Sequence, residues 1–198
     1  MSSSDSDVLR AWTSFYREYG LAMVAWQSVE SELATLFSIL TKIPPAMAIQ
    51  IFYSARSFNG RIDIFDAALT ASEASDEAKS FARALIKKAK KYSEYRNKFA
   101  HDQPLLHQYG SPAKFRVLMV DGKGQFQSDE VKKQYVEAAA KVSDITEAGD
   151  CFVKLAKLIR EFWAQSRAAR TASLDKLREQ FLALPNLPRT KGQSTVAR

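Results

Sequence analysis

The sequence predicts an all-α protein, a helical bundle with two long helices, short helices between them and a small inserted β-hairpin. Apolar residues recur in steps of three and four from Asp7 to about Thr41, which is the period of an amphipathic helix. Seven glycines and six prolines among 198 residues are few and favour long helices over a many-stranded sheet. The length and the 46% apolar content fit a single domain, which we place at residues 1–184.

The charge balance favours a polyanionic partner. The chain carries a net charge of +7, which indicates nucleic acid before an anionic membrane surface. Cys151 is the only cysteine, so an internal disulfide and a Cys/His zinc cage are both excluded. The N-terminus has no signal-peptide pattern, and no apolar run approaches the length of a membrane span. We therefore expect a cytoplasmic protein without metal, cofactor or membrane association.

The N-terminal half of the sequence is predicted to form one long helix and two short ones. The aromatic stripe of the helix at 7–41 is typical of a core or a dimer interface. The Pro44-Pro45 pair ends this helix because proline lacks a backbone donor and biases the preceding residue away from α. The short helices are predicted at 46–56 and 61–70, on either side of a break at 57–60.

The second long helix is predicted from Asp76 to Asp102. Ser75 is the preferred N-cap, and the two acidic residues that follow it suit the positive end of the helix dipole. Pro104 stops the helix at its other end.

Residues 114–127 hold the only strand-like pattern in the sequence. An apolar run ending at Val120 is followed by the Asp121-Gly122 pair and a short return run, which together indicate a β-hairpin. We interpret this hairpin as an insertion and not as a second domain.

The C-terminal third is predicted to be helical and then disordered. Ser128 begins a long helix that continues through Phe162, and a last helix, or the tail of the same one, reaches Leu184. Residues 185–198 are predicted to be a disordered basic tail.

The most basic run of the sequence lies in the helix at 76–102 and leads to a histidine. Between residues 83 and 98 a single acid, Glu94, stands against seven cations: Arg83, Lys87, Lys88, Lys90, Lys91, Arg96 and Lys98. On a helical projection three of them share a side that we expect to face solvent and to bind RNA, namely Lys87, Lys91 and Lys98.

The same projection separates two further faces of this helix. A core stripe runs through Phe81, Leu85, Tyr92, Tyr95 and Phe99, and a stripe of mostly small residues runs through Ala82, Ile86, Ala89, Ser93, Asn97 and Ala100. His101 lies one turn from Asn97, while Arg96 lies about 140° from His101 around a straight helix. Either the helix end loosens near His101, or two subunits pool their residues, with the small-residue stripe as their contact.

One histidine and one arginine on a basic surface are sufficient to cleave RNA without metal. The RNA supplies its own nucleophile, the 2′-OH, and an imidazole such as His101 offers a general acid or base near neutral pH. A guanidinium such as Arg96 stabilises the charge that builds on the phosphate oxygens. Asn97 would orient the imidazole or bind a phosphate oxygen, and the products would be a 2′,3′-cyclic phosphate and a 5′-OH. A histidine at this position is also a common partner of the helix dipole.

The segment Arg96-Asn97-Lys98-Phe99-Ala100-His101 resembles the Arg-polar-x-x-x-His signature of the HEPN superfamily. This resemblance implies an all-helical, metal-independent endoribonuclease that acts as a homodimer, with Arg96 and His101 as the catalytic pair and Asn97 as the supporting polar residue. It also implies a setting in toxin–antitoxin or phage-defence systems, where an antitoxin protein would be a partner. In one toxin subgroup a tyrosine stands two residues after the histidine and is modified by the partner; here that position is Gln103.

Other residues have simpler interpretations. His107 is interpreted as a surface histidine in a loop and Cys151 as a buried thiol. Arg56 and Arg61 would hold a phosphate at the start of the third helix or be solvated charges. Later cations would extend an RNA surface or solvate the outer face: Lys154, Lys157, Arg160, Arg167 and Arg170.

Two other functions fit the sequence. The first is a non-catalytic helical module that dimerises through the aromatic stripe and binds a partner protein or RNA. The second is a plain basic nucleic-acid-binding protein, whose binding would fall steeply with salt.

Overall fold

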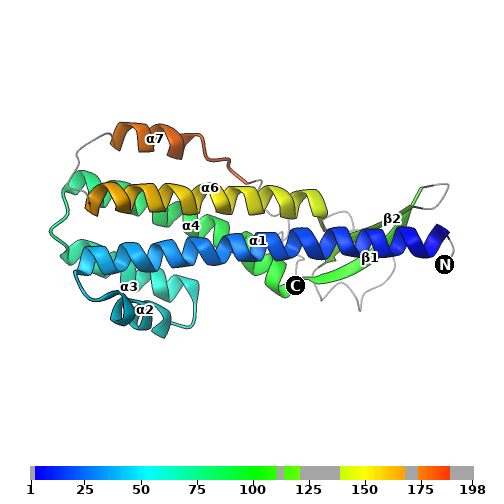
Figure 1. The fold of residues 1–198 in the computed structure, drawn as a ribbon, viewed down its shortest axis with the longest axis horizontal. Coiled ribbons are helices and arrows are strands. Elements are labelled where there is room, and N and C mark those ends of the chain that lie inside the picture. The colour runs from blue at the N-terminus through cyan, green and yellow to red at the C-terminus, as the bar shows by residue number, and fades with distance from the viewer. Residues whose placement is uncertain (1–2, 111–113, 121–138, 168–173, 188–198) are drawn as a thin grey trace, which may run out of the picture. The chain divides into compact units, whose positions relative to one another are not determined.

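The protein is mostly helical, as predicted, with one small antiparallel sheet. The computed structural model describes residues 3–110, 114–120, 139–167 and 174–187. Within them lie the following elements (Figure 1): α1 (Ser3–Thr41), α2 (Pro45–Ser54), α3 (Phe58–Ala71), α4 (Asp76–His101), β1 (Gln103–Tyr109), β2 (Lys114–Val120), β3 (Ala140–Lys141), α6 (Val142–Arg167) and α7 (Leu174–Leu182).

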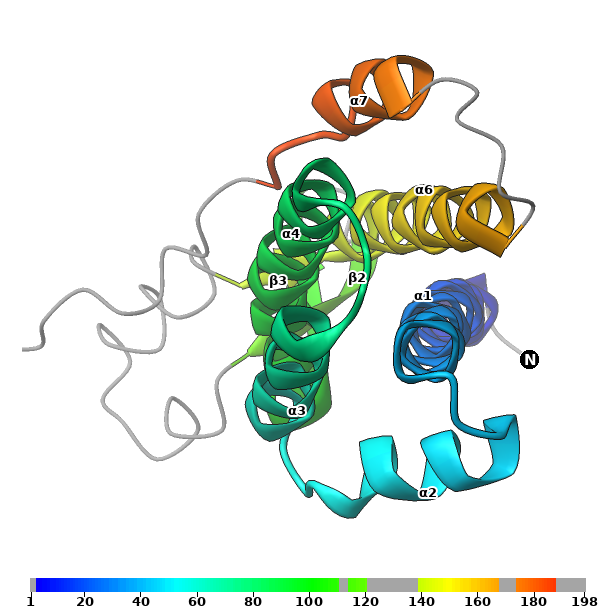
Figure 2. The same cartoon turned by 90° about the vertical axis from the view of Figure 1, so that its left-hand side faces the viewer.

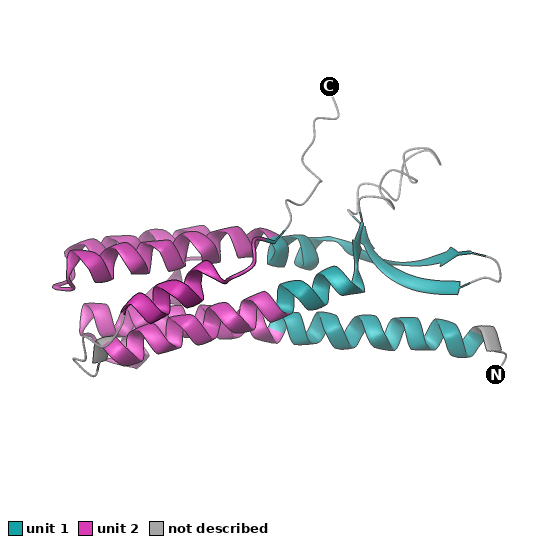
Figure 3. Ribbon diagram, turned by 90° about the horizontal axis from the view of Figure 1, so that it is seen from above, with its two compact units in different colours: residues 1–23, 95–149, 187–198 teal, residues 24–94, 150–186 magenta. Residues whose placement is uncertain are grey.

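The chain divides into two compact units (Figure 3). Unit 1 comprises residues 1–23, 95–149 and 187–198, and unit 2 comprises residues 24–94 and 150–186. The helices α1, α4 and α6 contribute residues to both units.

Unit 2 is a helical bundle with an aromatic core. Figure 2 shows its helices, with α7 on the outer side of α4 and α6. Trp26 of α1 lies 5.2 Å from Phe152 of α6, measured between ring centroids, and Phe81 of α4 lies 5.1 Å from Phe162. The buried members of the α1 aromatic stripe, Trp26 among them, therefore belong to the core, as predicted.

Two acidic side chains of α1 are buried in unit 2, and both are neutralised. Glu30 accepts a hydrogen bond from the indole nitrogen of Trp26 at 2.9 Å and pairs with Arg61 at 2.9 Å. Glu32 accepts hydrogen bonds from the indole of Trp163 at 2.7 Å and from Arg160 at 2.6 Å. Buried carboxylates require such partners because an unpaired buried charge is strongly unfavourable.

Helix starts follow the capping chemistry of the sequence. The hydroxyl of Ser75 accepts a hydrogen bond from the amide of Ala78 at 3.3 Å, which confirms it as the N-cap of α4. The hydroxyl of Ser57 accepts one from the amide of Gly60 at 3.1 Å and caps α3. The predicted break at 57–60 is therefore wrong beyond its first residue, because this cap starts the helix at Phe58.

Unit 1 contains the sheet, in the order β1-β2-β3. β1 pairs with β2 in an antiparallel register that places Gln103 opposite Val120 and Tyr109 opposite Lys114. The prediction that residues 114–127 hold the only strand is wrong, because residues 103–109 form β1 and pair with β2 across a turn near Gly110, whose φ is 75°. The other edge of β2 pairs with β3 at Leu118 and Met119. The predicted return run at 125–127 lies outside the described residues.

Among the described strands β1 lies at the edge of the sheet, which explains how it contains Pro104. A proline removes one ladder donor, and an edge strand tolerates that loss because one side of it has no neighbouring strand.

The start of α6 also differs from the prediction. Ala140 and Lys141 pair with β2, so the predicted helix from Ser128 to Phe162 is wrong at these two residues and α6 begins at Val142; residues 121–138 lie outside the described part. Gly149 lets α6 approach α1 within unit 1, since an added Cβ would lie 3.3 Å from the Cα of Ala22.

The C-terminal segment is ordered for longer than predicted. The hydroxyl of Tyr92 donates to the carbonyl of Pro185 at 2.7 Å, and the ammonium of Lys88 donates to the side chain of Asn186 at 3.0 Å. These contacts contradict a disordered tail from residue 185; residues 188–198 lie outside the described part. Burial raises the pKa of the Tyr92 phenol, and the contact with Cys151 raises it further.

Within the described residues, no single helix is long and apolar enough to cross a membrane. One bent pair, Asp5–Thr41 with Pro45–Ser54, passes the same test of length and composition at an angle of 117°.

Candidate active site

The predicted catalytic residues lie in the last turns of α4, within unit 1. The helix ends at His101, and the amide of Asp102 still donates to the carbonyl of Lys98 at 2.8 Å. Phe99 is buried and fixes this end of the helix, while Asn97 and His101 are exposed. The local fold therefore presents an imidazole and an amide to solvent one helical turn apart.

Arg96 is half-buried and is held by its neighbour. A terminal nitrogen of its guanidinium donates to the Asn97 amide oxygen at 3.1 Å. Its Nε atom is buried and has no hydrogen-bond partner among the described residues. Asn97 thus positions the arginine, whereas the sequence had suggested that it orients the imidazole or binds a phosphate oxygen.

Arg96 also lacks a carboxylate partner among the described residues. Six other described arginines each have one: Arg10, Arg17, Arg61, Arg83, Arg160 and Arg178. A guanidinium that no carboxylate neutralises retains its charge for a phosphate, which it can bind through two parallel N–H groups.

No hydrogen bond of the described residues joins Arg96 and His101, the predicted catalytic pair, within one chain. The hydrogen bond of Arg96 goes to Asn97, and no hydrogen bond or ion pair of the described residues links His101 to either side chain. This agrees with the separation of about 140° expected around a straight helix.

Most residues of the small-residue stripe of α4 pack inside the chain itself. Ala82, Ile86, Ala89 and Ser93 are all buried in unit 2, so they are not available to a partner helix as the sequence had suggested. Asn97 and Ala100, in unit 1, are exposed. A second subunit could meet this stripe only at the last turns of α4.

The predicted RNA-binding lysines fall in different units and environments. Lys87 and Lys91 of unit 2 are exposed, as predicted, whereas Lys98 of unit 1 is half-buried and does not share their solvent-facing side fully. Lys87 and Lys91 line a groove of about 330 Å³ whose other walls come from α4, α7 and the segment after α7: Ala84, Lys88, Phe181, Leu182, Leu184 and Asn186.

Lys88 in this groove has a structural role that the sequence did not reveal. Its ammonium donates to the carbonyl of Leu184 at 3.2 Å and lies 5.5 Å from the centre of the Tyr92 ring. Burial lowers the pKa of Lys88, and the charge of Lys91 lowers it further.

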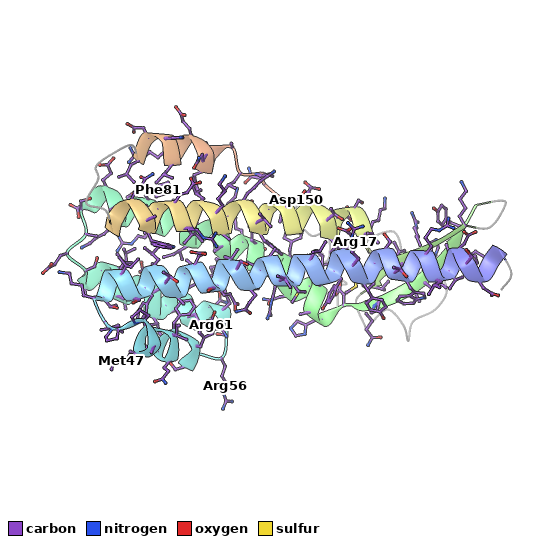
Figure 4. The ribbon with its side chains drawn as sticks, in the orientation of Figure 1. Arg17, Met47, Arg56, Arg61, Phe81 and Asp150 are labelled. Atoms are coloured by element: carbon purple, nitrogen blue, oxygen red, sulfur yellow. The ribbon has the colours of Figure 1, made fainter. Side chains whose placement is uncertain are left out.

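The contacts and exposure of the remaining candidate residues show which of their expected roles are possible. Arg61 pairs with Glu30 and stacks on Tyr53 at 4.6 Å, so the expected phosphate site at the start of α3 loses one of its two arginines. Arg56 is exposed and points away from the ribbon (Figure 4). Cys151 is buried, as predicted.

Three of the later cations and the second histidine have defined places, whereas the side chain of Arg167 and the whole of Arg170 lie outside the described residues. Arg160 pairs with Glu32, while Lys154 and Lys157 are exposed on α6. His107 lies in β1, half-buried, and not in a loop as expected.

Among the described residues, no group of three or more His, Cys, Asp or Glu side chains could hold a metal ion. No protein-family model, curated protein or solved structure matches this chain.

Proposed function

We propose that this chain is a metal-independent endoribonuclease of the HEPN type, acting in the cytoplasm as a toxin or phage-defence effector. Arg96 and His101 form the catalytic pair, and Asn97 positions Arg96. The observation that carries the proposal is an arginine without a carboxylate partner among the described residues, held by Asn97 at 3.1 Å, five positions before an exposed histidine.

The reaction requires only groups that this site presents. The imidazole of His101 takes the proton of the RNA 2′-OH, and the imidazolium so formed gives it to the leaving 5′-oxygen. The guanidinium of Arg96 binds the phosphate oxygens as negative charge builds on them. The 2′-oxygen attacks the phosphorus, the bond to the 5′-oxygen breaks, and the products are a 2′,3′-cyclic phosphate and a 5′-OH.

The site is complete only as a homodimer in this proposal. Five positions along α4 separate Arg96 and His101 by about 140° around the helix, so one target would be reached by the arginine of one subunit and the histidine of its partner. A second α4 would meet this helix at Asn97 and Ala100, which are both exposed.

Cleavage of mixed RNA by the purified protein tests this mechanism. We expect equal rates with and without EDTA, 2′,3′-cyclic phosphate ends, and no cleavage when the nucleotide 5′ to the broken bond carries a 2′-deoxy sugar. Loss of activity in EDTA, or cleavage of the deoxy substrate, would contradict the proposed use of the 2′-OH without metal.

The exposed lysines of unit 2 are proposed to bind the RNA backbone. Changing Lys87 and Lys91 to glutamine should weaken RNA binding and make the plot of log affinity against log salt less steep by about 1.4, which is about 0.7 for each phosphate contact of a single strand. The matched control changes the exposed Lys154 and Lys157 of α6 to glutamine. If both pairs change the slope equally, Lys87 and Lys91 form no specific RNA surface.

A non-catalytic dimerisation module is the second candidate, and the surface of α1 in unit 1 favours it. Leu9, Tyr16 and Leu21 are more than half exposed, at 58%, 59% and 56%. Such apolar exposure on a helix is typical of a protein–protein interface. A dimer without RNA cleavage would favour this candidate over the nuclease.

A further inference from the structure

The turn end of the β1–β2 hairpin in unit 1 carries a group of aromatic and cationic side chains on one face. In the antiparallel register Tyr109 lies opposite Lys114, and His107 lies opposite Arg116. Residues that face each other across an antiparallel pair, and those two apart along a strand, share a face of the sheet. We call these four residues the hairpin platform.

The side chains of the hairpin platform are stacked. The rings of His107 and Tyr109 are nearly parallel, with 2° between their planes and 6.4 Å between their centroids. The guanidinium carbon of Arg116 lies 4.7 Å from the centre of the Tyr109 ring. Tyr109 nevertheless is 40% exposed, so the stack is open to solvent.

The charge of the platform is not neutralised within the described residues. Neither Lys114 nor Arg116 has a carboxylate partner there, and the Nε atom of Arg116 is buried without a hydrogen-bond partner. A cross-strand cation–aromatic pair would by itself stabilise the hairpin. Stabilising the hairpin in this way would not require a second cation, Lys114, and a second aromatic ring, His107, beside the pair.

The same face of β2 changes character along its length. Leu118 and Val120, towards the other end of the strand, are buried in a cluster with Ala139. The apolar residues thus lie where the sheet is packed, and the cationic and aromatic residues lie where it is open.

We propose that the hairpin platform binds an unpaired RNA nucleotide, which stacks its base on Tyr109 while Lys114 and Arg116 contact its phosphate. Aromatic rings and arginine planes stack on the bases of single strands, whereas the bases of a duplex are already stacked on one another. Lysine and arginine supply the phosphate contacts that position the strand.

This inference rests on the proposed ribonuclease function and defines the substrate as single-stranded. The platform belongs to unit 1, which also holds Arg96 and His101. It would therefore hold a nucleotide of the same RNA strand that is cleaved.

RNA binding by a cleavage-deficient parent tests the platform. A fluorescein-labelled single-stranded RNA is titrated with the His101→Ala protein, and anisotropy gives the Kd. We expect Tyr109→Ala in this parent to raise the Kd about tenfold, because one base–aromatic stack is lost. Arg116→Ala should raise it to a similar degree, while Tyr109→Phe, which keeps the ring, should bind like the parent.

Two controls separate the platform from general charge and from folding. Arg10→Ala removes an exposed cation of the same unit, whose side chain is 77% exposed, and should leave the Kd within about twofold of the parent. Circular dichroism spectra of Tyr109→Ala and Tyr109→Phe at the temperature of the titration should match, which shows that both variants are folded. A duplex of the same sequence should bind Tyr109→Ala and the parent equally.

The outcomes distinguish this inference from the proposed function. If Tyr109→Ala and Arg116→Ala bind single-stranded RNA as tightly as the parent, the platform is not an RNA site, and the nuclease proposal stands. If the parent itself binds no RNA, both are overturned. If Arg10→Ala weakens binding as much as Arg116→Ala, the effect is general charge and the platform is again rejected.

Discussion

Replacing Glu30 by alanine is expected to lower the free energy of unfolding by about 3–5 kcal/mol. The variant leaves Arg61, whose side chain is only 17% exposed, without its carboxylate. It also removes the acceptor of the Trp26 indole, which is buried in the core of unit 2. An uncompensated charge and an unsatisfied donor then remain inside the protein, and both are costly. Chemical denaturation followed by circular dichroism measures the loss.

Three further variants separate the causes of this loss. Glu30→Gln keeps an acceptor for Trp26 but not the charge, so it should be less destabilising than alanine. The double variant Glu30→Ala/Arg61→Ala should lose less free energy of unfolding than the sum of the two single variants, because no unpaired buried cation remains. Asp7→Ala breaks an exposed pair with Arg10 and should change stability by less than about 1 kcal/mol. Equal denaturation midpoints for Glu30→Ala and the wild type would show that the network contributes nothing.

The helices could be predicted from the sequence because their signals are local. The period of the apolar residues from Asp7 to Thr41 and the cap at Ser75 depend on neighbours within a few positions. The hairpin could not be placed in the same way. Asp121-Gly122 is the stronger turn signal, yet β2 pairs with the residues before it and turns near Gly110.

The partners of the arginines explain why the site was only partly predictable. The motif from Arg96 to His101 is visible in the sequence, but whether its arginine pairs with a carboxylate depends on distant residues. Arg160 is neutralised by Glu32, 128 positions away, while Arg96 has no carboxylate among the described residues. The hairpin platform was missed because it needs the register of two strands. The available signal was a pair of i, i+2 motifs, His107/Tyr109 and Lys114/Arg116, around a turn containing glycine.

His101→Ala is expected to slow RNA cleavage by about 10²–10⁴-fold, which is the usual contribution of a general acid or base. Arg96→Ala should slow it by about 10²–10³-fold, because a donor to the developing phosphate charge is lost. Arg96→Lys should restore little, since an ammonium cannot reproduce the two parallel N–H groups of a guanidinium. Single-turnover cleavage of a labelled RNA measures these rates. The control is Arg17→Ala, which removes an exposed arginine of the same unit.

Mixing the two inactive proteins tests whether the site is shared between subunits. If each site takes Arg96 from one subunit and His101 from its partner, a dimer of one Arg96→Ala and one His101→Ala chain contains one intact site. Random exchange of subunits should then restore about a quarter of the wild-type activity, because half of the dimers are mixed and each has one of two sites. A site contained in one chain predicts no recovery, since every subunit lacks one catalytic residue. Recovery would therefore place the two side chains on opposite subunits, as expected from their separation of about 140° around α4.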